Sequence, residues 1–341
     1  MKKLKGINKI IFFFNSLVAA MLLLSYLLPY VAPKSFAFLS ILSLAVPLLI
    51  ILNVLFMVYW LLKVKKHLLV SLLVLVLGYN HVTSLYKFTS STNIEDSDNI
   101  AIMNFNVRLF NLYNWIPEDH VETNIVKLIK DAAPDIISFQ EYHPHDNVDL
   151  SFYKYKFEAL SGTRIKYGQA IFSKYPIVDS GSIAFPNTAN NAIYADIVKG
   201  EDTIRIYNVH LQSLRIDADV ENLKNADSEA LIKRVRETFE MQQLQTELFV
   251  KHKQGSPYKL VVCGDFNNTP YSYVYKEIKG DLIDAFHEAG NGFGRSFDFK
   301  YFPIRIDFIL VDNAFKVNGF KTFEEKLSDH YPILTKVSLH K

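Results

Sequence analysis

The first 86 residues contain no aspartate or glutamate, and this limits what the N-terminal part of the chain can fold into. Their eight charged side chains are all lysines, which separate long runs of Leu, Ile, Val and Phe. The uncharged runs cover residues 10–33, 35–62 and 68–86. Each run approaches or exceeds the roughly 20 residues that cross the hydrocarbon core of a bilayer as a helix. We therefore predict that residues 1–86 form a membrane domain with three transmembrane helices.

Two other interpretations of this segment are a cleaved signal peptide and a helical hairpin buried in a soluble protein. A signal peptide has an apolar region of roughly 7 to 15 residues and is not followed by two further apolar runs. A soluble protein would have to bury a segment of roughly 80 mostly apolar residues. The length of the segment therefore favours the membrane.

The lysines also predict how the chain is oriented in that membrane. Loops on the cytoplasmic side carry an excess of Lys and Arg, and lysines cluster at residues 2–9 and 63–66. Three crossings then place everything after residue 86 on the other side. Lys34, between the first two runs, is the one lysine that disagrees. We predict an integral protein of a bacterial-type inner or plasma membrane, with the lipid bilayer as a partner and an extracytoplasmic C-terminal domain.

The remaining 255 residues are acidic. Removing eight lysines from the 37 Lys and Arg of the whole chain leaves 29, against 35 Asp and Glu, a net charge of −6. Nonspecific binding of duplex DNA depends on many Lys and Arg contacts to phosphate, so this balance counts against a nucleic-acid substrate. The single cysteine, Cys263, excludes an intramolecular disulfide, and a chain of this length can be stable through its core alone.

The acidic part contains many strand-like runs and few helical ones. Residues 87–99 are rich in Ser, Thr, Asn and Asp, which predicts a linker before a folded domain at 100–341. Helical spacing occurs at 118–132 and at about 228–253. Strand-like runs cover 100–107, 135–140, 169–173, 192–198, 203–210, 259–263, 304–311 and 333–338. The pattern predicts a two-sheet α/β sandwich, preceded by the three transmembrane helices, rather than a doubly wound parallel sheet.

Short motifs place polar side chains at the ends of these runs: MNFNV, FQEY, NVHL, CGDFNN, RIDF and SDHYP. Glu141 follows one run directly, and its carboxylate is the hard oxygen ligand that Mg²⁺, Mn²⁺ or Ca²⁺ takes. Asp265 and Asn267 stand two residues apart just past another run, so they face the same side in an extended chain. Taken singly, Glu141 is more typical of a solvated loop residue, and the segment with Asp265 and Asn267 is equally typical of an ordinary turn.

Two histidines also stand at the ends of strand-like runs. His210 ends one run, and His330 follows Asp329 just before the last run. A carboxylate can hold a metal or orient an imidazole, and an oriented imidazole exchanges protons with water or a leaving oxygen. Asp307 stands between apolar neighbours, where a buried carboxylate needs a partner. Arg305, on the same face, and His330 are both candidates for that partner.

Taken in order, these motifs resemble the endonuclease/exonuclease/phosphatase superfamily, the fold shared by deoxyribonuclease I, exonuclease III, inositol polyphosphate 5-phosphatases and neutral sphingomyelinases. The similarity covers about residues 100–339, and the order GDFN, RIDFIL, SDHYP is its most specific part. GQAIFSKYPI at residues 168–177 is similar to the central strand of the family. The resemblance implies a four-layer, deoxyribonuclease I-like sandwich with metal-dependent hydrolase activity on phosphate ester bonds.

The resemblance also implies the metal site. Asn106, Glu141 and Asp329 would lie around the metal ion, with Mg²⁺ or Mn²⁺ as the cofactor. Such an ion neutralises phosphate charge and stabilises the leaving oxygen.

The other site residues would be catalytic. The resemblance implies that Asp265 and Asn267 position the attacking water and the phosphate, and that Asp307 orients His330. His210 would contact the scissile phosphate or help to protonate the leaving group. Exonuclease III and its abasic-site relatives do not carry a His in the position of His210, so the resemblance disfavours abasic-site repair.

One stretch departs from the deoxyribonuclease I pattern. That enzyme pairs its equivalent of His210 with a Glu shortly before the central strand, whereas residues 164–167 here read Arg-Ile-Lys-Tyr. The sequence therefore predicts no orienting partner for His210. Arg164 and Lys166 either hold a second anionic group of the substrate or are simply exposed.

We predict a membrane-anchored phosphoesterase whose substrate is either nucleic acid or a lipid headgroup. The anchor, the acidic domain and the missing Glu favour the lipid, and the commonest activity of the family favours nucleic acid. The alternative is a noncatalytic membrane receptor or scaffold that keeps the fold. Transport by the spans has little support, because they contain no acidic residue. An aromatic-rich stretch at 293–302 is predicted to form a loop near the site. The sequence predicts no protein partner. It leaves open which metal is preferred, whether the ester is a monoester or a diester, and the oligomeric state.

Overall fold

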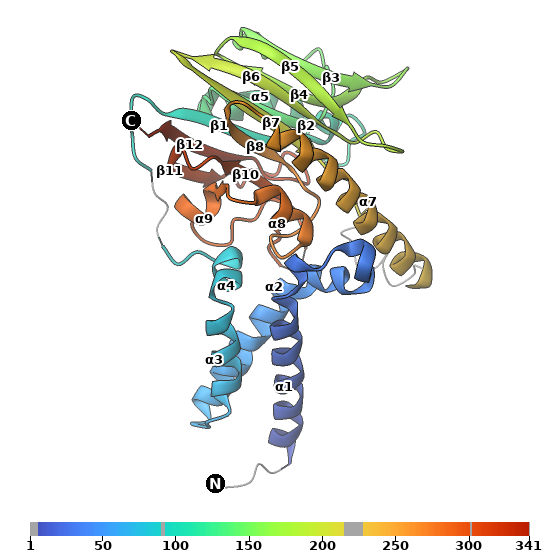
Figure 1. Cartoon of the computed structure of the whole chain (residues 1–341), viewed down its shortest axis with the longest axis vertical. Coiled ribbons are helices and arrows are strands. Elements are labelled where there is room, and N and C mark those ends of the chain that lie inside the picture. Colours follow the sequence, from blue (N-terminus) through green and yellow to red (C-terminus); the bar gives the residue numbers. More distant parts are fainter. Residues whose placement is uncertain (1–5, 90–92, 215–227, 301, 341) are drawn as a thin grey trace.

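The computed structural model describes residues 6–89, 93–214, 228–300 and 302–340. An apolar helical part and a two-sheet part are stacked along the long axis of the molecule (Figure 1). The helical part consists of α1 (Ile7–Ser25), η1 (Leu28–Tyr30), α2 (Pro33–Leu62), α3 (Leu68–Leu77) and α4 (Tyr79–Leu85).

Two stretches of the helical part, Ile7–Tyr30 and Leu39–Leu62, are long and apolar enough to cross a membrane. The axes of α3 and α4 are bent by 82°, so they form a third crossing only if the bent pair is one span. The bend lies at Gly78, where a Cβ atom would come 2.0 Å from the hydroxyl oxygen of Tyr26. Two or three segments apolar enough to cross a membrane therefore precede the sheets, where the sequence predicted three.

The lysines of this part lie at opposite ends of the helices. The N-terminal end of α1, whose first turns contain Lys9, and the 63–66 segment lie at the end farthest from the sheets (Figure 1); Lys2, Lys3 and Lys5 are outside the described residues. Lys34 lies at the other end, against α7 (Ser228–Gln254). Its backbone N–H donates to Gln243 Oε1 at 2.8 Å, and its Nζ is 3.5 Å from Glu247 Oε2. Lys34 did not fit the predicted clustering of lysines on the cytoplasmic side, and its ion pair with Glu247 of the folded domain accounts for its position.

The rest of the chain contains two six-stranded mixed sheets. In spatial order, the first sheet consists of β11 (Phe315–Thr322), β12 (Ile333–Leu339), β1 (Ile100–Asn106), β2 (Ile136–Tyr142), β4 (Tyr167–Ser173) and β3 (Tyr155–Ser161). The second consists of β5 (Ile177–Ala184), β6 (Asn191–Lys199), β7 (Asp202–His210), β8 (Lys259–Asp265), β10 (Asp307–Val311) and β9 (Ile283–Asp284). The strand-like patterns missed β3, β5, β9 and β11, which are the four edge strands.

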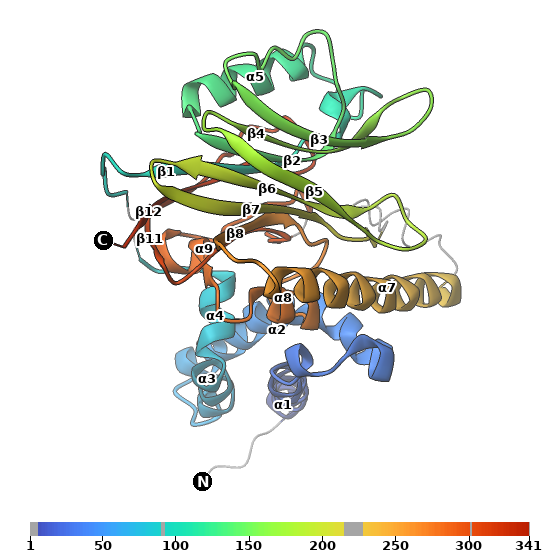
Figure 2. The ribbon, with the colours of Figure 1, turned by 45° about the horizontal axis from the view of Figure 1, so that its top comes forward.

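The sheets pack face to face, and helices cover their outer faces (Figure 2). Helix α5 (Val121–Ala132) covers the first sheet, with Ile125 and Ile129 in the cluster that contains Phe139 of β2. Helices α7 and α8 (Tyr273–Lys279) cover the second sheet, with Phe249 packed in the cluster that contains Phe308 of β10. The short α9 (Ala285–Ala289) contributes to the core between the sheets. The predicted two-sheet α/β sandwich is confirmed.

Strand alternation decides which side chains reach the space between the sheets. On β8, Val261 and Cys263 are buried in the inter-sheet core, so Asp265 points to the same side. The same period places His210 at the end of β7 and Asp307 at the start of β10 on the inter-sheet side. The space between the sheets is therefore apolar at one end and carries ionisable side chains at the other.

The segment that follows β8 joins the sheets to the apolar helices. Thr269 Oγ1 donates to the carbonyl oxygen of Ser43 at 3.2 Å, within the Leu39–Leu62 stretch. Tyr271 is buried in a cluster with residues of α1 to α4, and its hydroxyl donates to the carbonyl oxygen of His81 at 3.2 Å. The edge of the sandwich where β8 ends is thus held against the apolar helices.

Candidate active site

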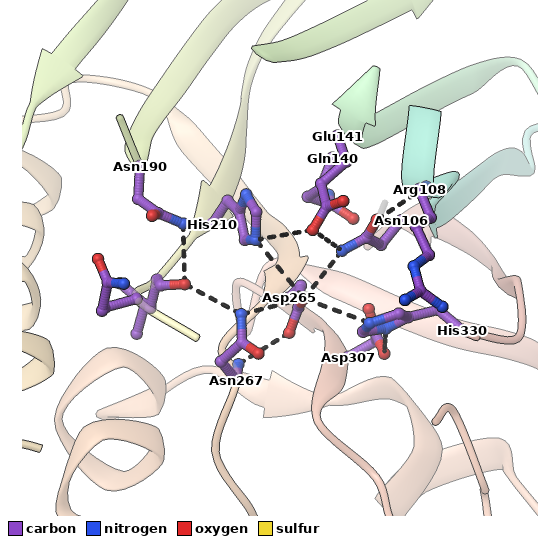
Figure 3. A network of polar contacts seen from close by, with 12 residues as sticks. Asn106, Arg108, Gln140, Glu141, Asn190, His210, Asp265, Asn267, Asp307 and His330 are labelled. Atoms are coloured by element: carbon purple, nitrogen blue, oxygen red, sulfur yellow. Dashed lines mark hydrogen bonds and ion pairs between the residues drawn. The ribbon is translucent and has the colours of Figure 1, made fainter. Parts of the chain in front are cut away.

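The register of three neighbouring strands brings three of the predicted site residues side by side. His210 of β7 pairs with Asp265 of β8, and Asp265 pairs with Asp307 of β10. The facing sheet contributes Asn106 at the end of β1 and Glu141 near the end of β2. Figure 3 shows these side chains converging from the two sheets.

Asp265 is the centre of this network. Its Oδ2 accepts hydrogen bonds from Asn106 Nδ2 at 3.0 Å and from Asn267 Nδ2 at 3.2 Å. Its Oδ1 accepts from the backbone N–H of Asn267 at 2.8 Å. Burial raises the pKa of Asp265 to about 7, against the opposing effect of the nearby His330. A carboxyl with such a pKa can take up and release a proton near neutral pH.

His330 lies between two buried carboxylates. Its Nδ1 is 2.9 Å from Asp307 Oδ2, and its Nε2 is 3.6 Å from Asp265 Oδ2. Burial alone would lower the pKa of His330, but the negative charges of Asp307 and Asp265 outweigh it and raise the pKa well above its usual value. Of the two partners considered for Asp307, the structure selects His330, because Arg305 pairs with Asp284 at 2.7 Å instead.

His210 is buried in the same site, close to two carboxylates. Its Nε2 lies 3.7 Å from Asp265 Oδ2 and 3.9 Å from Glu141 Oε1. Burial, followed by the charge of His330, lowers the pKa of His210 to about 3. Arg164 and Lys166, where deoxyribonuclease I would have its orienting Glu, are exposed.

Glu141 and Asp329 lie at the mouth of the site, where both side chains are partly exposed. Glu141 has a φ of 48°, next to a register shift in the pairing of β2 with β4. A positive φ in a residue other than glycine is uncommon and clusters at functional sites. Burial, and then the charge of Asp329, raises the pKa of Glu141. The two carboxylates are therefore close enough to repel each other.

The oxygen donors of this mouth fit a divalent cation of the Mg²⁺ or Mn²⁺ type, which would offset the repulsion between Glu141 and Asp329. Asn106 presents its Nδ2 to Glu141 at 3.4 Å, so its amide would have to turn to offer the oxygen that the sequence predicted as a ligand. A second possible metal group is Asp265, Asp307 and His330, whose ligand atoms lie within 4.8 Å of one another. There, Asp307 Oδ1 is buried without a hydrogen-bond partner.

Arg108 is a site residue that the sequence motifs did not indicate. Its Nη1 is 2.9 Å from Asp329 Oδ2, and its guanidinium lies 4.6 Å from the ring centroid of Trp115. It begins η2 (Arg108–Asn111), in which all four residues have positive φ, from 42° to 60°. This left-handed turn brings the guanidinium of Arg108 to the mouth of the site. No local sequence pattern predicts the turn.

A layer of buried amides behind the site was also missed. Gln140 Nε2 donates to Asn104 Oδ1 at 2.8 Å and also to Asn208 Oδ1. Asn208 Nδ2 in turn donates to the carbonyl oxygen of Phe139 at 2.7 Å. Asn104 and Asn208 each stand two residues before a predicted site residue on the same strand. Because side chains two apart in a strand point to the same side, this spacing could have predicted that both amides face the site.

Helix α7 supports the loop that follows Asp265. Gln242 Nε2 donates to the carbonyl oxygens of Gln212 at 2.7 Å and Asn267 at 3.2 Å. Gln242 Oε1 accepts from Asn268 Nδ2 at 2.8 Å. The helix that contacts Lys34 of the membrane part therefore also fixes the loop that carries Asn267.

The predicted aromatic loop does lie beside this site. Phe297 stacks edge-on against His330, with ring centroids 5.0 Å apart. Ser296 Oγ accepts the backbone N–H groups of Ile306 and Asp307, both at 3.0 Å. These contacts fix the loop on β10; Tyr301 is outside the described residues.

Comparison with known proteins identifies relatives of both parts. The profile of the Endonuclease/Exonuclease/phosphatase family matches residues 103–330, and that of a domain of unknown function matches residues 8–85. No curated protein matches the chain.

Solved structures share the two-sheet fold. A humanized D. rerio TDP2 has 16% sequence identity and a TM-score of 0.55, over 71% of this chain and 100% of that one. An endonuclease/exonuclease/phosphatase from Bacteroides vulgatus has 20% identity and a TM-score of 0.53, over 71% and 99%. The human Nocturnin catalytic domain with bound sulfate has 17% identity and a TM-score of 0.53, over 71% and 94%. At such identities the likeness shows the fold alone, which is the predicted deoxyribonuclease I-like sandwich.

Proposed function

Because the chain belongs to the endonuclease/exonuclease/phosphatase family, we propose that it is a membrane-anchored phosphoesterase that depends on a divalent metal, Mg²⁺ or Mn²⁺. The observation that carries this proposal is the position of His330 between Asp307 and Asp265, 2.9 Å from the first and 3.6 Å from the second. An imidazole placed between two buried carboxylates is suited to stabilising the charge that develops when a phosphate ester is hydrolysed.

In the proposed reaction, the oxygen of a water molecule attacks phosphorus, and the bond between phosphorus and the leaving oxygen breaks. Asp265 takes one proton from the attacking water and later releases it to solvent, and the leaving oxygen takes up one proton from solvent, so a diester and water give a monoester and an alcohol. Asn267 holds Asp265 through two hydrogen bonds and fixes its direction. A raised pKa suits Asp265 to this exchange of protons.

The two histidines have different parts in this proposal. His330 is kept protonated by Asp307, and its positive charge faces the negative charge that develops on the phosphate. His210 stays neutral, because burial lowers its pKa, and serves as a hydrogen-bond donor to a phosphate oxygen or the leaving group.

Glu141 and Asp329, with Asn106 beside them, are the proposed metal ligands. Their carboxylate oxygens are the hard donors that Mg²⁺ and Mn²⁺ take. When bound, the ion supplies charge neutralisation at the phosphate and the leaving oxygen. Arg108 stands next to Asp329 and is suited to hold a phosphate oxygen on the same side.

The membrane anchor and its orientation are part of the same proposal. The stretches Ile7–Tyr30 and Leu39–Leu62 have the length and hydropathy of membrane spans. The N-terminal end of α1, which contains Lys9, and the 63–66 segment lie at the end of the helices away from the sheets, and their lysines support a cytoplasmic position for that end. We place the active site outside the cytoplasm, in a bacterial-type inner or plasma membrane.

The test is hydrolysis of bis-p-nitrophenyl phosphate by the full chain in detergent. We expect turnover with Mg²⁺ or Mn²⁺, loss of turnover with EDTA, and recovery when the metal is restored. His330→Gln should lower kcat by about 10²- to 10³-fold, the usual cost of removing one group that stabilises transition-state charge. His143→Gln is the matched control, because His143 is a partly exposed histidine that is bonded to the Lys166 carbonyl oxygen.

Asp307→Asn adds a second arm to this test. Because Asp307 acts through His330, the double variant His330→Gln/Asp307→Asn should lose little more activity than the single variant His330→Gln. Equal rates for the wild type and His330→Gln would defeat the proposal. Absence of turnover from a folded wild-type chain would favour the noncatalytic receptor.

A further inference from the structure

Two exposed aromatic side chains lie beside the mouth of the active site. Tyr113 is 56% exposed and Trp115 is 41% exposed, and their ring centroids are 5.1 Å apart. Single exposed apolar residues are common on protein surfaces and need no explanation. These two rings, however, contact each other edge-on, and one of them also contacts a residue of the site. We call Tyr113 and Trp115 the aromatic shelf.

Arg108 connects the aromatic shelf to the active site. Its guanidinium lies over the Trp115 ring, 4.6 Å from the centroid, and its Nη1 is 2.9 Å from Asp329 Oδ2. About a third of the Arg108 side chain is exposed, so one side of the guanidinium remains open to solvent. The shelf, the guanidinium and a proposed metal ligand thus form a continuous row of contacts at the mouth.

The loop that carries the shelf is fixed at both of its ends. Phe110 and Ile116, which flank the shelf in the sequence, are both buried in the core cluster of the first sheet. The side chain of Asn111 accepts the backbone N–H of Ile116 and donates to its carbonyl oxygen, both at 2.9 Å. The two aromatic rings are therefore held in a defined place although they are exposed.

The backbone of this loop adopts an unfavourable conformation. Residues 108–111 and Asn114 all have a positive φ, from 42° to 60°. Residues other than glycine rarely adopt such angles, and they keep them where the surroundings force them, often at ligand-binding sites. The result of this conformation is that Arg108 and the shelf stand together at the mouth, which suggests a role in binding.

The chemistry of this row fits a flat ring that is joined to a phosphate. Aromatic side chains stack on planar rings, because such rings have a π-face. A guanidinium binds phosphate oxygens through charge-assisted hydrogen bonds. A choline-type headgroup fits less well, because the Trp115 ring already has the positive charge of Arg108 over it.

We propose that the aromatic shelf determines substrate specificity by stacking on a planar ring of the substrate, while Arg108 holds the adjacent phosphate. The inference rests on the proposed phosphoesterase activity and names its substrate class, which is a small phosphate ester that carries an aryl ring or a nucleobase. The net charge of −6 over residues 87–341 repels a long nucleic-acid strand along its length. A single ring-bearing ester meets only the mouth of the site.

The first test measures binding without turnover. The full chain with Asp265→Asn, in detergent with Mg²⁺, is titrated by calorimetry with phenyl phosphate, thymidine 5′-monophosphate and glycerol 3-phosphate. We expect the two ring-bearing ligands to bind about tenfold more tightly than glycerol 3-phosphate, and Trp115→Ala to remove this preference. Tighter binding of thymidine 5′-monophosphate than of phenyl phosphate would identify the ring as a nucleobase, and the reverse order would identify it as an aryl group.

Tyr258→Ala is the matched control for this titration. Tyr258 is 38% exposed and its ring also lies near an arginine, 5.8 Å from the guanidinium of Arg205. It precedes the first residue of β8, whose last residue is Asp265, so it lies at the far end of that strand. Tyr258→Ala should keep the preference for ring-bearing ligands, and so should Trp115→Phe, which retains a ring. Equal preferences in Trp115→Ala and Tyr258→Ala would overturn the proposal.

The second test locates the bound ring by tryptophan fluorescence. The chain has two tryptophans, and Trp60 is buried within α2. Thymidine 5′-monophosphate should quench the fluorescence of the Asp265→Asn chain, because its base stacks on Trp115. The same ligand should leave the fluorescence of Trp115→Phe unchanged, because only Trp60 emits there. Equal quenching in both chains would place the ring away from the shelf and contradict the proposal.

These tests separate the inference from the proposed function. A wild-type chain that hydrolyses bis-p-nitrophenyl phosphate, in a protein that binds all three ligands equally, keeps the phosphoesterase and removes the role of the shelf. A wild-type chain that hydrolyses nothing, in a protein that prefers the ring-bearing ligands and shows the quenching, removes the phosphoesterase and keeps the shelf as a ligand site.

Discussion

Arg305 and Asp284 form an ion pair inside the sandwich, with both side chains buried. The guanidinium also lies between the rings of Phe286 and Phe308, at 4.6 and 4.8 Å from their centroids. Tyr275 donates its hydroxyl to Asp284 Oδ2 at 2.7 Å. Because Arg305 pairs with Asp284, it does not pair with Asp307, which lies two residues later and pairs with His330 instead. A structural ion pair thus influences which partner is available in the proposed catalytic pair.

At the scale of this residue pair, we predict that Asp284→Asn lowers the free energy of unfolding by about 3 kcal/mol, because it leaves a buried guanidinium without its counter-charge. For a domain of this size that corresponds to roughly 6–12 °C in Tm. Asp202→Asn, which removes an exposed pair with Lys259, should change Tm little. Thermal unfolding of the full chain in detergent measures both, and equal shifts would contradict the prediction.

The same pair has a pH signature. Burial would raise the pKa of Asp284, but Arg305 and the Tyr275 hydroxyl outweigh it and lower the pKa below its usual range. A folded-state pKa below the unfolded value stabilises the protein above the unfolded pKa, and this stability is lost as pH falls through the folded one. The Tm difference between wild type and Asp284→Asn should therefore shrink in acid, below the ordinary pKa of an aspartate.

At the scale of elements, the pairing of β7 with β8 decides the distance between His210 and Asp265. Gly264 allows this pairing, because a Cβ there would lie 2.1 Å from the carbonyl oxygen of Val209 on β7. The backbones of the two strands approach closely just before the residues that the site needs. Glycine at this position is thus a requirement of the site as well as of the sheet.

We predict that Gly264→Ala pushes β7 away from β8 and lowers kcat on bis-p-nitrophenyl phosphate by about 10²-fold, the cost of roughly 1 Å of misplacement. Overpacking should also destabilise the chain by about 1–3 kcal/mol. Gly255→Ala is the control, because a Cβ there meets only the His252 carbonyl oxygen at 3.5 Å. Wild-type kcat in Gly264→Ala would show that the strand pairing tolerates the methyl group.

At the scale of the whole molecule, the membrane helices and the sandwich form one packed unit. Tyr271 of the sandwich is buried among the helices, and Lys34 of the helices pairs with Glu247 of α7. The lysines of residues 63–66 lie at the far end (Figure 1). The active site and those lysines should therefore lie on opposite sides of the bilayer.

Cysteine labelling tests this orientation, because the native Cys263 is buried and can be replaced by Ala. In a Cys263→Ala background expressed in bacteria, a membrane-impermeant maleimide should label Lys154→Cys in intact cells. It should label Lys65→Cys only after the membrane is disrupted. The reverse pattern would place the active site in the cytoplasm and remove the proposed location.

Local patterns in the sequence were enough for the two-part architecture and for most of the site. The absence of acidic residues before residue 87 predicts the apolar helices, and strand ends in order predict which polar side chains gather. These features depend on neighbours along the chain. The edge strands β3 and β5 were missed because many of their side chains are only partly buried, so no clear apolar alternation marks them.

Other features were decided only by contacts between distant residues. The partner of Asp307 depends on Asp284, which lies 23 positions earlier on an edge strand. The position of Arg108 depends on a left-handed turn, and the bend at Gly78 on the ring of Tyr26 from another helix. The cavity of about 1330 Å³ that is lined by the 291–300 loop, β11 and α5 exists only when these elements are packed together. Sequence patterns report periodicity and composition, whereas register, ion-pair choice and cavities arise only when separate elements pack.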